Sequence, residues 1–152
     1  MNFLPDDELL QKILAPMEPV LKTFHKLNPE EKEAFYAAAY GFYQTGDYEK
    51  SEQFFTHLVL NDPFDKRFWK GVASSRQMQK KYQEALHSWS VLCLFDPKNP
   101  LPHFHAAECL LSLNQYEEAE KALNCSERLI DETHLLKEKI IDLKNLCRDH
   151  LQ

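Results

Sequence analysis

Apolar positions along this chain recur at helical spacing and are interrupted by short polar breaks. Two such breaks are Thr45-Gly46-Asp47 and Gln79-Lys80-Lys81. Apolar residues spaced three and four apart between breaks of this kind indicate amphipathic α-helices. The chain holds only three glycines, so the Gly-rich turns that commonly separate strands are missing. The pattern therefore predicts an all-α fold, with helix along almost the whole chain.

The helical pattern repeats. Asp62-Pro63 and Asp96-Pro97 are the same dipeptide, and 97 − 63 = 34 residues separate them. Shifting the chain by this period aligns four columns of similar residues: Tyr48, Tyr82 and Tyr116; Ala39, Ala73 and Ala107; Ser51, Ala85 and Ala119; Phe55, Trp89 and Leu123. A 34-residue period with aromatic and small columns is typical of tetratricopeptide helix-turn-helix repeats. The sequence predicts three such repeats, stacked in a right-handed solenoid.

A chain of 152 residues fits one domain. Its predicted parts are an N-terminal helical leader (6–27), repeat 1 (29–63), repeat 2 (66–97), repeat 3 (100–131) and a C-terminal capping helix (133–150). The repeat helices are expected over 29–44 and 48–61, 66–78 and 82–95, and 101–113 and 116–129.

The ends of these segments carry local signals. Gly46 suits the positive φ of the turn between helices, and Lys80 and Asn114 occupy the same column. Thr133 is expected to cap the last helix at its N-terminus. Pro16 interrupts the leader, which either covers the end of the first repeat or packs against a partner.

Composition and charge exclude several functions. The net charge is −6, and the one short basic cluster, Lys80 and Lys81 with Arg76, is interpreted as a solvated corner, so nucleic-acid binding is not expected. The acidic N-terminus and the lack of a long apolar run argue against export and against stable membrane insertion. The four cysteines form no Cys-x-x-Cys pair and are expected to be reduced.

Enzymatic chemistry has no support in the sequence. No Gly-rich phosphate loop is present, and no histidine has a Ser or Cys partner at a familiar spacing. His103 and His105 point about 200° apart on a helix, so they do not converge on a metal. We expect a protein that is not an enzyme and that has no metal or cofactor.

Function is therefore expected on the concave face. In tetratricopeptide arrays this face is formed mainly by positions two, five, nine and twelve of each repeat. The predicted peptide-binding groove consists of Tyr36, Tyr40, Tyr43, Arg67, Lys70, Ser74, Gln77, Phe104, Glu108 and Leu111. It is aromatic or apolar at both ends and polar in the middle. The tyrosines could instead fill the core, but Phe35, Ala39 and Phe42 already supply the buried side of that helix.

Three segments resemble a narrower family. They are Arg67-Phe68-Trp69-Lys70-Gly71 with the helix that follows it, "YQTGDYEKSEQFF" at 43–55, and "FHAAECLL" at 104–111. Over residues 28–130 the chain resembles the class II chaperones of bacterial type III secretion, which serve the translocator proteins.

This resemblance implies a non-enzymatic chaperone of the bacterial cytoplasm. It would hold an extended segment of a hydrophobic translocator in the groove, keep translocators soluble and apart before export, and form homodimers through its N-terminal helical region. The alternative is a general tetratricopeptide scaffold that docks a protein partner through the same groove.

Overall fold

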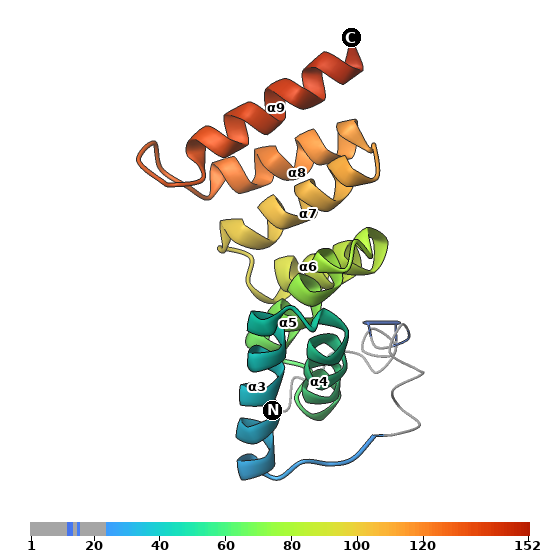
Figure 1. The fold of residues 1–152 in the computed structure, drawn as a ribbon. Coiled ribbons are helices and arrows are strands. Elements are labelled where there is room, and N and C mark those ends of the chain that lie inside the picture. Colours follow the sequence, from blue (N-terminus) through green and yellow to red (C-terminus); the bar gives the residue numbers. More distant parts are fainter. Residues whose placement is uncertain (1–11, 14, 16–23) are drawn as a thin grey trace.

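The computed structural model describes residues 12, 13, 15 and 24–152, and its helical segments are shown in Figure 1. Residues 24–152 form helices and contain no strand, as predicted for an all-α fold. The helices are α3 (Pro29–Thr45), α4 (Tyr48–Asn61), α5 (Lys66–Met78), α6 (Tyr82–Phe95), α7 (Pro100–Ser112), α8 (Tyr116–Arg128) and α9 (Lys137–Leu151). The six helices α3 to α8 begin and end within one residue of the predicted bounds.

These helices form a stack of helical pairs. Each one contacts the next along the chain, and the stack runs from α3 and α4 at one end to α9 at the other (Figure 1). α3 also contacts α5, so the first helices of repeats 1 and 2 lie side by side. This arrangement is the tetratricopeptide architecture, in which the first helices of successive repeats share one face.

The turns within the three repeats have the same backbone geometry. Gly46, Lys80 and Asn114 have φ values of 84°, 60° and 58°. The next residue in each turn donates its backbone N–H to a carbonyl five positions earlier, at 2.9–3.0 Å. Bonds of this kind close the end of a helix and require the left-handed conformation. Lys80 adopts it at a cost of about 1 kcal/mol, because its Cβ crowds the backbone.

The columns of small residues lie where helices cross. Ala39, Ala73 and Ala107 are completely buried, as is Ser51. Ser51 donates to the Ala39 carbonyl at 2.9 Å and accepts from the Ser75 hydroxyl at 3.0 Å. Small side chains allow α3, α4 and α5 to approach closely. The hydroxyls of Ser51 and Ser75 are completely buried, and they satisfy each other's hydrogen-bonding capacity.

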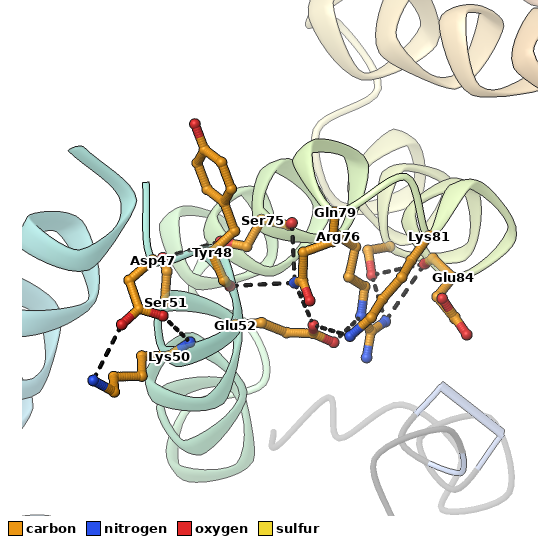
Figure 2. Close-up of polar contacts among 11 residues, drawn as sticks. Asp47, Tyr48, Lys50, Ser51, Glu52, Ser75, Arg76, Gln79, Lys81 and Glu84 are labelled. Atoms are coloured by element: carbon orange, nitrogen blue, oxygen red, sulfur yellow. Dashed lines mark hydrogen bonds and ion pairs between the residues drawn. The ribbon is translucent and has the colours of Figure 1, made fainter. Parts of the chain in front are cut away.

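A polar network joins repeat 1 to repeat 2. Figure 2 shows the Glu52 carboxylate of α4 beside Arg76, Gln79 and Lys81, which come from α5 and the turn after it. The three donors reach this carboxylate at 2.7–2.8 Å. Burial raises the pKa of Glu52, but these hydrogen bonds outweigh burial and bring the pKa below its ordinary value. The charged carboxylate is therefore the stable form in the folded chain.

The interpretation of Arg76 as part of a solvated corner was wrong. Its side chain is 5% exposed, and it also donates to the Ser88 hydroxyl of α6 at 3.0 Å. Arg76 lies on the face of α5 that α4 and α6 enclose. A buried guanidinium requires this full set of acceptors, because an unpaired charge in the interior is strongly unfavourable.

The last helix begins later than predicted. Thr133 does not cap this helix. Its backbone N–H and its hydroxyl donate instead to the Asp131 carboxylate, at 3.0 Å and 2.8 Å. Residues 131–136 therefore form turns, and α9 starts at Lys137. Ile140 and Cys147 of α9 are completely buried, in a cluster with Leu123 of α8. α9 thus covers the apolar end of repeat 3.

Most of the predicted leader, including the break at Pro16, lies outside the described residues. Ile13 is 5% exposed and belongs to the same core cluster as Val91 of α6. Its carbonyl lies 3.2 Å from Nε2 of His87, also on α6. Residues 24–28 are not helical. Asn61 holds this segment: it accepts from the Leu27 amide at 2.7 Å and donates to the His25 carbonyl at 3.1 Å.

Candidate functional site

Three adjoining hollows follow the face formed by α3, α5 and α7. The tyrosine hollow, of about 340 Å³, is lined by residues of α3, α4 and α5. The histidine hollow, of about 280 Å³, shares Tyr43 and Ser74 with it. The third, of about 130 Å³, lies toward the beginning of α7 and shares Arg67 and Lys70 with the tyrosine hollow. Because neighbouring hollows share lining residues, they form one continuous groove.

The tyrosine hollow is aromatic. Tyr36, Tyr40 and Tyr43 follow one ridge of α3, and Tyr40 is 51% exposed. The ring of Phe55 lies edge-on to Tyr36 with centroids 6.0 Å apart. A methyl group added at Gly71 would lie 2.3–2.5 Å from Phe55, so glycine leaves room for this ring. Exposed aromatic surface with a polar hydroxyl rim suits the binding of an apolar peptide segment.

Cations lie along the α5 side of the groove. The Arg67 guanidinium stands 5.1 Å from the centroid of the Tyr36 ring and pairs with Asp65 at 2.7 Å. The hydrogen bonds that Arg67 donates to the Asp65 carboxylate raise the pKa of Arg67. Lys66 pairs with Asp96 at 3.2 Å. Lys70 lines both the tyrosine hollow and the third hollow. Three cations therefore line the groove, and two of them are paired with carboxylates.

A hydrogen-bonded network forms the wall of the histidine hollow. The Trp89 indole donates to the Gln77 side chain at 2.8 Å, and Gln77 donates to Glu108 at 3.0 Å. His105 contacts the same carboxylate oxygen at 2.7 Å and stacks on Trp89 with centroids 4.7 Å apart. Burial raises the pKa of Glu108, but the bonds from His105 and Gln77 outweigh it and lower this pKa. The network fixes a charged carboxylate in the groove.

The structure brings together eight of the ten predicted groove residues. These are Tyr36, Tyr40, Tyr43, Arg67, Lys70, Ser74, Gln77 and Glu108. Leu111 does not line the hollows described above and packs against the C-terminal core cluster.

Phe104 also belongs to the core rather than to the groove. It is 4% exposed and lies in the cluster that includes Leu136 and Ile140. Phe104 occupies the same repeat position as Lys70, whose flexible chain carries its charge to solvent. A phenyl ring has no polar end, and the apolar side chains around α9 enclose it.

Sequence reasoning missed His105 as a groove residue and treated Phe55 and Trp89 only as packing. All three line the hollows. The aromatic column of Phe55 and Trp89 was visible, but whether a buried ring also lines a hollow depends on the neighbouring helices. His105 follows the predicted fifth position of its repeat by one residue, so a wider window of positions would have included it.

The described residues supply no metal centre. Among them, no group of three or more His, Cys, Asp and Glu side chains could hold a metal ion. His103 and His105 have separate partners, since His103 Nδ1 lies 3.5 Å from the Cys93 sulfur. None of the described helices has the length and apolar character that crossing a bilayer requires.

The tetratricopeptide repeat family model matches residues 68–99. The low calcium response locus protein H of Yersinia pestis is 36% identical over 134 residues, which cover 84% of this chain and 80% of that protein. The chaperone protein SicA of Salmonella typhimurium is 28% identical over 113 residues, covering 74% of this chain and 67% of SicA.

Solved structures show the same likeness. The type III secretion chaperone SycD of Yersinia enterocolitica, in complex with a peptide of the translocator YopD, matches with a TM-score of 0.76 and 31% identity. The match covers 84% of this chain and all of that one. PcrH of Pseudomonas aeruginosa, in complex with the chaperone-binding region of PopD, matches with a TM-score of 0.76 and 28% identity, covering 83% and 97% of the two chains.

Proposed function

This chain belongs to the translocator chaperones of type III secretion, and on that basis we propose that its groove binds an extended segment of a hydrophobic translocator. Binding would keep translocators soluble and apart before export. The family consists of chaperones rather than enzymes. We place the chaperone in the bacterial cytoplasm, where cargo must be held before secretion, and we include homodimers through the N-terminal region, since SycD has been crystallised as a dimer.

One observation carries this proposal: the tyrosine ridge of α3 opens into a hollow that the described residues leave unfilled. A hollow of about 340 Å³ can accept one or two apolar side chains. An extended segment presents alternate side chains to the groove, while the polar groups of Ser74 and Gln77 can receive its backbone. The relatives with this architecture include SycD and PcrH, each solved with a translocator segment.

The binding contribution of Tyr40 can be isolated from its structural contribution. Tyr40 is 51% exposed and has no aromatic ring partner among the described residues, unlike Tyr36 and Tyr43. Truncating an aromatic anchor at the centre of an interface costs about 2 kcal/mol or more, which is roughly a thirtyfold loss of affinity. The same truncation should leave the fold intact, because about half of this residue is exposed.

The test is co-expression with a translocator encoded by the same genome. Alone, such a cargo should be insoluble; with the wild-type chain it should appear in the soluble fraction as a copurifying complex. Tyr40→Ala should lose most of the complex, whereas Leu94→Ala, at an exposed apolar residue outside the hollows, should retain it. A cargo that stays insoluble beside the wild-type chain would contradict the chaperone and favour a scaffold. If Tyr40→Ala and Leu94→Ala lose the complex equally, the assignment of cargo binding to the groove is refuted.

A further inference from the structure

Of the cations that line the groove, one has no ion-pair partner among the described residues. Lys66 pairs with Asp96 at 3.2 Å, and Arg67 forms a two-pronged pair with Asp65 through contacts of 2.7–3.2 Å. The Glu108 carboxylate accepts from Gln77 and contacts His105. Among the residues that the structure describes, Lys70 has no ion-pair partner. It is a groove-lining cation that no carboxylate of the described part of the chain pairs with.

The place of Lys70 matters as much as its lack of a partner. It lies on α5 one turn after Arg67 and one turn before Ser74, and all three line the tyrosine hollow. It also lines the third hollow together with Trp89 and Leu101. A segment passing along the groove from the tyrosines toward α7 must therefore pass its ammonium group. Lys70 is exposed, and its side chain lines both hollows.

We propose that the bound segment carries an aspartate or glutamate whose carboxylate pairs with Lys70, next to the apolar side chain that fills the tyrosine hollow. This inference rests on the proposed function. A carboxylate is the chemical complement of an unpaired ammonium, and bound cargo would exclude part of the water that screens the pair. The chain has a net charge of −6, so it repels acidic segments in general and attracts one where this cation lies.

The neighbouring charges do not compete for this role. Both nitrogens of Arg67 that face Asp65 are already used, and its guanidinium also covers the Tyr36 ring. Lys66 is turned to Asp96 at the other edge of the groove. Glu108 accepts a hydrogen bond from Gln77 and contacts His105. The expected signature at Lys70 is therefore one acidic position.

A library of random twelve-residue peptides displayed on phage provides the probe. Wild-type chain should select peptides with Asp or Glu at a fixed separation from a large apolar residue. Lys70→Ala should select apolar peptides without the acidic position, and Lys70→Glu should select Lys or Arg there instead. Lys98→Glu makes the same charge change at an exposed residue outside the hollows, and it should select the wild-type motif.

One selected peptide then allows a quantitative check. Replacing its acidic residue by the matching amide should weaken binding to wild type about tenfold and leave binding to Lys70→Ala unchanged. Selection of apolar peptides without acidic enrichment, or the same enrichment by Lys70→Glu, would overturn this inference and leave the groove proposal standing. If wild type selects no peptide above background, the peptide-binding groove itself is refuted, and this inference with it.

Discussion

The buried pair of Glu52 and Arg76 gives the sharpest test of how the first two repeats are joined. Arg76→Met removes the cation and keeps an unbranched apolar stem. Removing one member of a buried ion pair costs about 3–5 kcal/mol, because the other charge remains uncompensated. Glu52 keeps its contacts with Gln79 and Lys81, so we expect the lower end of this range. A loss of about 3 kcal/mol corresponds to roughly 6–12 °C in melting temperature.

Urea unfolding followed by circular dichroism measures this loss, and a double-mutant cycle assigns it. Adding Glu52→Gln to Arg76→Met removes the uncompensated carboxylate. The double variant should therefore be more stable than the sum of the single losses predicts, by about 1–3 kcal/mol. Lys121→Met is the matched control, since its pair with Glu117 joins two side chains about 70% exposed and should leave the free energy of unfolding unchanged.

The same pair has a defined pH dependence. The pKa of Glu52 is lower in the folded chain than its ordinary value of 4.5. Its stabilising contribution is therefore complete above that value and is lost as the pH falls through the folded-state pKa. The wild-type free energy of unfolding should decrease below about pH 4.5, and Glu52→Gln should lose less over this range. Additive losses in the cycle, or an Arg76→Met cost under about 1 kcal/mol, would refute the reasoning.

Three further predictions concern the groove and the core. Phe104→Ala should lower the free energy of unfolding by about 3–5 kcal/mol in urea titrations, because it empties a core site, whereas Tyr40→Ala should leave it nearly unchanged. Gly71→Ala should cost about 1–3 kcal/mol and weaken peptide binding, since the new methyl displaces the Phe55 ring from the groove floor. Burial raises the pKa of Cys93 to about 11 and of Cys109 to about 12, so mass spectrometry should find both unalkylated after iodoacetamide treatment at pH 8 and alkylated once unfolded.

The sequence could locate most of the residues that line the groove, but it could not show which residues at groove positions are buried in the core instead. A repeat period assigns each residue to a face of its helix, and this local property placed Tyr36, Lys70 and Glu108 along one surface. The exposure of a residue on that face depends on what packs beside it. Phe104 occupies a groove position by period but lies in the core, because the apolar residues around α9 enclose it. The binding role of the groove residues remains a proposal that the experiments above test.

The sequence by itself determined the helices, the turns and the repeat register of this protein. The helices and the left-handed turns at Gly46 and Asn114 depend on residues a few positions apart, and the register follows from the 34-residue columns. Only the tertiary structure decided that Arg76 is buried and that Gln77 holds Glu108, 31 residues away. Helix formation is a matter of local hydrogen bonds and spacing, whereas burial and charge pairing are properties of surfaces that meet only when the repeats stack.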